Sequence, residues 1–284
     1  MSLLLRVRQS VKVLVHTLAP GMAVKKAFSN KSEAEPELEL LPELVDSSRA
    51  AIDVGGNLGT YTHRLVGLAK KVTVFEAHPR LASVLSRSFP QAEVRNEAVS
   101  DQHGQVTLRV PRRDGLSIEG LGSLELASDE PNLESFSVPA VTLDDLGDRD
   151  AGFIKIDVEG HELHVLNGAR GLIARQRPVF LVETEERHKA GSVQEVFAFF
   201  KALDYVGIFV YGKDVLPVEQ FTLAMQDVVA AKTHERPEGL YANNFIFFPA
   251  EKWSTGKLER LIALRRKTAP ASTPEAASVA GANS

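Results

Sequence analysis

The sequence predicts an α/β fold, in which a mostly parallel sheet of seven strands carries helices on both faces. Short apolar runs alternate along the chain with longer runs of helical periodicity, an order typical of parallel sheets. The first apolar run passes directly into a glycine-rich turn that begins at Gly55. No long helix separates the last two apolar runs, so the last strand is expected to be antiparallel.

The elements follow from these patterns in chain order. Strands are predicted at 50–55, 71–76, 92–99, 152–157, 178–183, 204–211 and 242–248, and helices at 59–69, 79–88, 161–174 and 192–203. The third helix is the clearest, because its apolar residues share one face: Leu163, Leu166, Ala169, Leu172 and Ile173. Two further strands, at 104–110 and 134–142, are expected to form an extension of the domain.

The 284 residues are 44% hydrophobic and 25% charged, enough for one sizeable domain with appendages. We divide the chain into a basic amphipathic arm, an acidic linker, a catalytic domain, a C-terminal helix and a disordered tail: 1–32, 33–46, 47–250, 251–267 and 268–284. The linker is expected to be solvated, with a short helix near its end. The tail is rich in Ala, Ser, Pro and Thr, a composition that does not build a core.

The arm contains six Lys and Arg residues and no acid before Glu33. Three hypotheses stay open for it: a helix or lid packed on the domain, contact with an anionic membrane surface, and a targeting sequence. Arg6, Arg8 and Lys12 interrupt its apolar run, which argues against a secretory signal. No apolar run approaches the ~20 residues that span a bilayer. We therefore expect a cytoplasmic protein with peripheral membrane contact through 1–32 as an alternative, and the oligomeric state stays undetermined.

Composition narrows the function classes. A net charge of −4 argues against a protein that binds nucleic acid by neutralising phosphates. The chain has no cysteine, which excludes disulfides, thiolate nucleophiles and cysteine zinc sites.

The glycine-rich turn and the acid Glu76 at the end of the second strand indicate a nucleotide-cofactor site. A dinucleotide fingerprint needs G-x-G-x-x-G, but ending it on Gly59 puts Val54 at the first glycine, and starting it at Gly55 also fails. Asp53, just before the turn, would repel a pyrophosphate. S-adenosylmethionine has no phosphate and carries a sulfonium cation, so the turn favours it over NAD. A purely structural turn is the alternative.

Five segments, which cover roughly residues 50–185, resemble the FkbM family of S-adenosylmethionine-dependent methyltransferases. They are Asp53-Val-Gly-Gly-Asn-Leu-Gly-Thr-Tyr-Thr, Phe75-Glu-Ala-His-Pro79, Asn96-Glu-Ala-Val-Ser-Asp101, Lys155-Ile-Asp-Val-Glu-Gly-His-Glu with Val165-Leu-Asn-Gly-Ala, and Arg177-Pro-Val-Phe-Leu-Val-Glu183. The resemblance implies a Rossmann-like class I methyltransferase fold. Family members often have proline in place of His78 and alanine in place of Gly56; we expect neither change to disturb cofactor binding.

Ligands of open α/β sheets lie at the carboxyl ends of the strands. This rule and the family motifs give the predicted cofactor-binding residues: Asp53, Gly55, Gly56, Asn57, Gly59, Tyr61, Thr62, Glu76, Ala77, Asn96, Glu97, Ala98 and Asp157. Glu76 is expected to accept hydrogen bonds from both ribose hydroxyls, unless it only caps the next helix. Asn96, Glu97 and Ala98 are expected to flank the adenine.

The candidate catalytic residues are Asp157, Glu159, His161 and Glu183. Asp157 follows a buried strand, where a carboxylate is costly without a partner. The partner can be the substrate, the sulfonium or Lys155, and a helix N-cap is the structural alternative. His188 is an alternative general base in a loop that is expected to lie over the site.

His161 and His164 lie three residues apart on one helix. We considered metal binding by this pair with Asp157 or Glu183, but the spacing is not that of a known ligand motif, so no metal is expected. The glycine-rich segment 111–136 is interpreted as an acceptor-side loop or as a disordered excursion.

These observations predict an O-methyltransferase that acts on a hydroxyl of a small molecule or glycan; the oxygen acceptor is implied by the family resemblance. Two alternatives remain: a noncatalytic Rossmann-fold scaffold in a glycan-assembly complex, and an NAD-dependent oxidoreductase. A base methyltransferase of nucleic acid would carry an Asn-Pro-Pro-Tyr type run where this chain has Asp157-Val-Glu-Gly160. No nucleic-acid partner is therefore expected.

Overall fold

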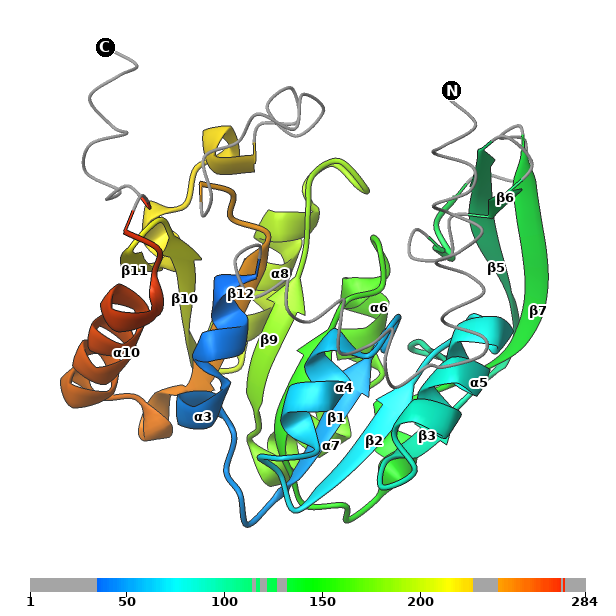
Figure 1. Cartoon of the computed structure of the whole chain (residues 1–284), viewed down its shortest axis with the longest axis horizontal. Helices are drawn as coiled ribbons and strands as arrows, with labels where there is room; N and C mark the ends of the chain where they lie inside the picture. Colours follow the sequence, from blue (N-terminus) through cyan, green and yellow to red (C-terminus); the bar gives the residue numbers. More distant parts are fainter. Residues whose placement is uncertain are drawn as a thin grey trace.

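The computed structural model describes residues 35–113, 116–117, 122–126, 132–226, 240–271 and 273. The arm 1–32, most of the tail and part of the segment 111–136 lie outside the described residues. Eight strands form the central sheet, in the order β11-β10-β12-β9-β8-β1-β2-β3 (Figure 1). Their bounds are β1 Ala50–Val54, β2 Lys71–Phe75, β3 Glu93–Arg95, β8 Ala151–Ile156, β9 Val179–Glu183, β10 Tyr205–Tyr211, β11 Asp214–Pro217 and β12 Asn244–Pro249.

Strands β3, β2, β1, β8 and β9 run parallel, and β12 runs antiparallel between β9 and β10. This confirms the α/β fold and its antiparallel last strand. The sheet has one strand more than predicted. A two-residue turn at Gly212, whose φ is +63°, folds β11 back onto β10, with Tyr211 opposite Asp214. Such short edge strands lack a long apolar run and so give a weak sequence signal.

Helices cover both faces of the sheet (Figure 1). Helices α6 Glu162–Asn167, α7 Arg170–Gln176 and α8 Ser192–Ala202 pack on one face, against alternate strand residues such as Ile154 and Phe180. The opposite face carries α3 Leu41–Leu44, α4 Thr60–Leu65, α5 Pro79–Ser88 and α10 Thr255–Thr268, which cover Phe153 and Leu181. Burying both faces explains why these strands read as continuous apolar runs.

The predicted helix 161–174 is two helices, α6 and α7. Gly168 ends α6 where the chain passes so close to Ser100 that a Cβ would overlap the Ser100 carbonyl oxygen. The Asp144 carboxylate then accepts hydrogen bonds from the backbone N–H groups of Gly171 and Leu172, at 3.0 and 2.5 Å, and so caps the start of α7. Tertiary contacts therefore divide a segment whose apolar periodicity is continuous.

A second sheet extends beyond the central one, where β5 and β7 form a long ribbon (Figure 1). Its order is β4-β7-β5-β6, with bounds β4 Ala98–Val99, β5 Gly104–Arg113, β6 Leu116–Ser117 and β7 Leu133–Val141. The predicted strand 92–99 is split, because β3 pairs in the central sheet and β4 pairs with β7. Leu108, Val110 and Val138 form a small third core at the base of the ribbon.

The acidic segment before β1 is packed, although a solvated linker was expected. A 3₁₀ turn at Pro36–Glu39 and helix α3 bury Leu38, Leu40 and Leu41 against α4 and α10. Glu37 is buried with them, and burial raises its pKa to about 7. The leucines between the acids drive this packing, because burying their apolar surface contributes more free energy than hydrating the segment as a solvated linker would. Among the described helices, none is both long enough and apolar enough to cross a membrane.

Candidate active site

The glycine-rich turn brings the end of β1 against the end of β8. Gly55 has φ +84°, and a Cβ there would overlap the carbonyl oxygen of Asp157. The backbone N–H groups of Gly55 and Gly56 both donate to the carbonyl of Phe75, at 2.9 and 3.1 Å. Asn57 follows in the left-handed region, with φ +48°. Only glycine at position 55 permits this approach, which sets Asp157 beside the turn.

Glu76 is held at the end of β2 by two backbone donors. Its Oε2 accepts from the N–H of Asn57 and its Oε1 from the N–H of His78, both at 2.7 Å. The side-chain amide of Asn96 donates to the carbonyls of Glu76 and Ala77 and fixes the turn between them. Burial raises the pKa of Glu76 to about 7. Each carboxylate oxygen keeps a second acceptor position, so Glu76 can still accept from two ligand hydroxyls.

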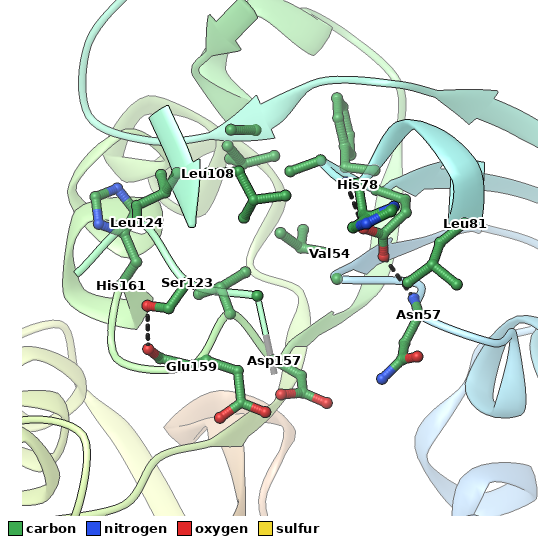
Figure 2. Close-up of a pocket in the computed structure, with 18 of the residues that line it drawn as sticks. Val54, Asn57, His78, Leu81, Leu108, Ser123, Leu124, Asp157, Glu159 and His161 are labelled. Carbon is green, nitrogen blue, oxygen red and sulfur yellow. Dashed lines mark hydrogen bonds between the residues drawn. The ribbon is translucent and has the colours of Figure 1, made fainter. Parts of the chain in front are cut away.

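A pocket lies over these strand ends (Figure 2). One part of its wall is apolar and draws on both sheets: Val54, Leu81, Ala98, Val99, Leu108 and Leu124. Nine predicted site residues line it: Gly55, Asn57, Glu76, Ala77, Glu97, Ala98, Asp157, Glu159 and His161. The pocket therefore joins an apolar compartment to a carboxylate-rich edge.

Other predicted residues lie beneath the pocket. Thr62 donates to Asp53 Oδ2 at 2.5 Å, and Asp53 is buried, which raises its pKa to about 6. Gly56 packs on Val74 and Leu85 and Gly59 on Phe89, so neither position has room for a side chain. These residues shape the turn from below.

Lys155 is a buried cation between two carboxylates. Its side chain is 1% exposed, and Nζ lies 3.8 Å from Asp157 Oδ2 and 3.7 Å from Glu183 Oε2. The ring of Tyr61 lies beneath it, with Nζ 4.9 Å from the ring centroid. Burial lowers the pKa of Lys155, whereas the negative charges of Asp157 and Glu183 raise it. The net result is a pKa above the ordinary value of a lysine. Burial and the charge of Asp157 hold the pKa of Glu183 well above its ordinary value.

The turn after β8 directs Glu159 toward the loop after β9. Glu159 has φ +53°, an unusual conformation for a residue with a side chain. Ser123 donates to its carbonyl at 2.6 Å (Figure 2), and its Oε2 lies 2.7 Å from His188 Nε2. Burial lowers the pKa of His188, whereas the hydrogen bond and charge of Glu159 raise it. The net result is a pKa above the ordinary value of a histidine.

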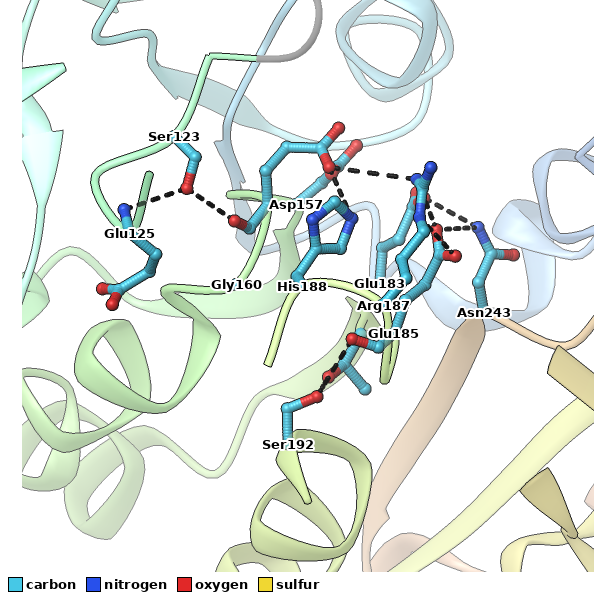
Figure 3. Close-up of polar contacts among 12 residues, drawn as sticks. Ser123, Glu125, Asp157, Gly160, Glu183, Glu185, Arg187, His188, Ser192 and Asn243 are labelled. Atoms are coloured by element: carbon cyan, nitrogen blue, oxygen red, sulfur yellow. Dashed lines mark hydrogen bonds and ion pairs between the residues drawn. The ribbon is translucent and has the colours of Figure 1, made fainter. Parts of the chain in front are cut away.

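A second group of polar contacts borders this edge (Figure 3). Arg187 holds Glu185 through two contacts of 2.8 Å, and Tyr241 donates to the same carboxylate. Asn243 donates to Glu183 Oε1 at 2.7 Å. The side chains of Asp157 and Glu183 remain 25% and 21% exposed, whereas that of Glu185 is 3% exposed.

His161 also lines the pocket and has its own partners. Its Nδ1 is 2.5 Å from Glu125 Oε1 and its Nε2 is 2.9 Å from Ser100 Oγ. Because both nitrogens are engaged, His161 has no free nitrogen for an acceptor proton in this arrangement.

Sequence reasoning missed the residues at and just before the start of β12. Tyr241, Asn243 and Asn244 reach the site because an antiparallel strand begins, rather than ends, at the carboxyl edge of its parallel neighbours. The antiparallel strand expected at 242–248 could have indicated these residues, because the start of such a strand lies at the edge where the parallel strands end. The wall residues Leu108 and Leu124 were also missed, since they come from the second sheet and its loop.

A family model described as the methyltransferase FkbM domain matches residues 53–206, more than half of the chain. The chain belongs to the FkbM methyltransferase family. The matched residues run from the turn at Asp53 to β10, and so include the glycine-rich turn, Glu76 and the Lys155–Glu159 segment. No curated protein matches the chain significantly.

Solved structures resemble the FkbM domain at low identity. An FkbM methyltransferase from Methylobacillus flagellatus KT is 16% identical, with TM-score 0.46, over 71% of this chain and 44% of that one. An rRNA methylase from Streptococcus thermophilus is 12% identical, with TM-score 0.41, over 75% and 92%. A Bacillus cereus O-methyltransferase in complex with SAH is 12% identical, with TM-score 0.40, over 84% and 96%. This chain spans less than half the length of the first, and none of the three indicates the acceptor.

Proposed function

We propose that this FkbM domain binds S-adenosylmethionine in the pocket and transfers its methyl group to a hydroxyl of a small molecule or glycan. One observation carries the proposal. The backbone-held carboxylate of Glu76 and the partly exposed carboxylate of Asp157 line the same pocket, at the ends of strands on either side of β1.

The residues present fit this cofactor. The apolar wall suits an adenine ring, and Glu76 has acceptor capacity left for the two ribose hydroxyls. Asp157, beside the glycine turn, offers a negative charge to the sulfonium and ammonium groups. A dinucleotide would bring its pyrophosphate to an edge lined by Asp157 and Glu159, where charge repulsion opposes it.

When bound, S-adenosylmethionine supplies an electrophilic methyl group. The protein aligns the acceptor oxygen and removes its proton. Asp157 is the proposed proton acceptor, because its carboxylate lines the pocket beside the glycine-rich turn. Glu183 lies at the same edge, where Asn243 and Lys155 hold its carboxylate. Glu159 orients His188, and we propose no proton transfer by His161, given its contacts with Ser100 and Glu125.

The charge of the edge favours a neutral acceptor. Four carboxylates gather here, those of Asp157, Glu159, Glu183 and Glu185, against the cations of Lys155 and Arg187. Carboxylates accept hydrogen bonds from polyol hydroxyls, whereas they repel phosphate-rich substrates. We therefore propose a neutral glycoside or polyol and no nucleic acid.

The experiment is transfer of labelled methyl from S-adenosylmethionine to a panel of neutral glycosides and polyols, with an RNA oligonucleotide and primary amines as comparison acceptors. The expected product is a methyl ether on a hydroxyl compound. Labelled RNA or amine as the main product would contradict the proposal. Cofactor binding with no transfer to any member would favour the scaffold alternative.

The basic segment 1–32 is proposed to act in acceptor capture or peripheral membrane contact, since it carries six cations and no acid. Deleting it should leave cofactor affinity unchanged and reduce either methyl transfer or binding to anionic vesicles. If the truncated protein retains both, the segment has neither role.

A further inference from the structure

Three potential metal ligands lie together beside the pocket, outside the strand-end carboxylates. Glu125 belongs to the segment 122–126, His161 precedes α6 and His164 lies within it. One ligand atom from each residue lies within 4.8 Å of the other two. The two imidazole rings stack with centroids 4.4 Å apart and planes 12° apart, so the exposed ring of His164 has to turn before both rings can ligate one ion. The loop and the helix therefore present one carboxylate and two imidazoles to the same small volume.

Each imidazole has an outer partner that orients it. Ser100 Oγ lies 2.9 Å from His161 Nε2, and Asp101 Oδ2 lies 2.9 Å from His164 Nδ1. A proton on each of these nitrogens leaves His161 Nδ1, which now contacts Glu125, and His164 Nε2 as the nitrogens that can ligate an ion. Metal-binding histidines in proteins are commonly oriented in this way by a hydroxyl, carbonyl or carboxylate.

We propose that Glu125, His161 and His164 bind a divalent transition-metal ion of the zinc type. Two imidazole nitrogens and one carboxylate oxygen are ligands that Zn²⁺ accepts, with water in the fourth position. Nδ1 of His161 lies 2.5 Å from Oε1 of Glu125, and two ligands of a tetrahedral zinc lie about 3.3 Å apart. Glu125 is 36% and His164 46% exposed, so both side chains have room to turn and admit the ion.

The proposed ion would stabilise one wall of the pocket. Glu125 is two residues from Ser123, which lines the pocket and donates to the Glu159 carbonyl at 2.6 Å. A bond from Glu125 to His161 and His164 would tie the segment 122–126 to α6. The ion would thus stabilise the pocket wall and would take no part in methyl transfer, and its binding does not depend on the proposed function.

The test is calorimetric titration of the full chain, freed of metal with a chelator, with Zn²⁺. Co²⁺ absorption in the visible range gives a second readout of nitrogen and oxygen ligation. We expect one site in the native protein. His164→Ala and Glu125→Gln should weaken Zn²⁺ binding by more than ~100-fold, and Asp101→Asn by ~10–100-fold. His164 and Glu125 are exposed, so both variants should fold.

His103→Ala is the matched control, since His103 is an exposed histidine that pairs with Asp145 at 3.3 Å, and it should bind Zn²⁺ as the native protein does. Absence of a Zn²⁺ site in the native protein would overturn the proposal. So would native affinity in both His164→Ala and Glu125→Gln, because the ion would then lie elsewhere.

Discussion

The ammonium group of Lys155 lies 3.7 Å from the carboxylate of Glu183, and only 1% of the lysine side chain is exposed. The two residues lie on neighbouring parallel strands, β8 and β9. The same ammonium is 3.8 Å from Asp157. One buried cation therefore balances two carboxylates at the edge where we place methyl transfer.

Lys155→Met should destabilise the fold by about 3–5 kcal/mol near pH 8, because it removes the buried cation that balances the neighbouring carboxylates of Asp157 and Glu183. Without the ammonium, the folded-state pKa of Glu183 rises further above its unfolded value. Ionisation then opposes folding, so the loss should be smallest near pH 5 and grow as the pH rises. Urea unfolding at both pH values measures this. Lys189→Met, which breaks an exposed pair with Glu195, should cost little at either pH. An equal loss for Lys155→Met at both pH values would refute the charge-balance account.

Gly55→Ala should destabilise the fold by about 3 kcal/mol or more, since φ is +84° and the new Cβ would overlap the Asp157 carbonyl. If the protein still folds, cofactor affinity should fall, because the turn must move. Gly67→Ala is the control, as its nearest outside atom, the carbonyl oxygen of Arg64, would lie at 3.6 Å. Thermal unfolding of both variants decides; equal melting temperatures would show that the close approach is not required.

Asp157→Asn should reduce methyl transfer by ~10²-fold or more while it leaves the fold intact, the scale of a general-base contribution. The amide keeps the shape and a hydrogen-bonding oxygen but cannot accept the proton. Single-turnover transfer and binding of S-adenosylhomocysteine should be measured on the same preparation. Normal turnover would exclude Asp157 as the base and point to His188 with Glu159. Unfolding would instead make Asp157 a structural residue.

Cofactor affinity should fall as the pH drops below about 7, the pKa to which burial raises Glu76. Ribose hydroxyls donate to the ionised carboxylate, so binding favours the form that has lost its proton. About one-tenth of Glu76 is ionised one unit below its pKa, so S-adenosylhomocysteine should bind roughly tenfold more weakly at pH 6 than at pH 8. Glu76→Gln should lack this dependence. The same slope in the variant would assign the titration to another group, such as Asp53.

Most of the central sheet could be predicted from the sequence, because buried parallel strands and amphipathic helices have distinct hydrophobic patterns. Strands 50–55 and 71–76 were predicted within one residue of β1 and β2. The break at Gly168 was not, since it depends on the close approach of Ser100, distant in the chain. The packing of Leu38 and Leu41 was missed because their acidic neighbours give the segment a polar composition.

For the site, the strand-end rule brought Glu76 and Asp157 to one pocket. The rule could not identify the side chains that donate to the neighbouring carboxylates, because Asn243 and Tyr241 come from the start of an antiparallel strand. It also placed His161 among the catalytic candidates, whereas the folded loop pairs that imidazole with Glu125. Contacts between a loop and a helix leave no periodic signal in a sequence.

The most direct test of the central claim is calorimetric titration of the native protein with S-adenosylhomocysteine and, separately, with NAD. The account predicts one binding site for S-adenosylhomocysteine and none for NAD. Glu76→Gln should weaken that binding tenfold or more, since hydrogen bonds to a charged group contribute about 1.5–3 kcal/mol each. Glu195→Gln, on the exposed surface of α8, should bind as the native protein does. Binding of NAD as tight as that of S-adenosylhomocysteine, or an unchanged dissociation constant in Glu76→Gln, would contradict the account.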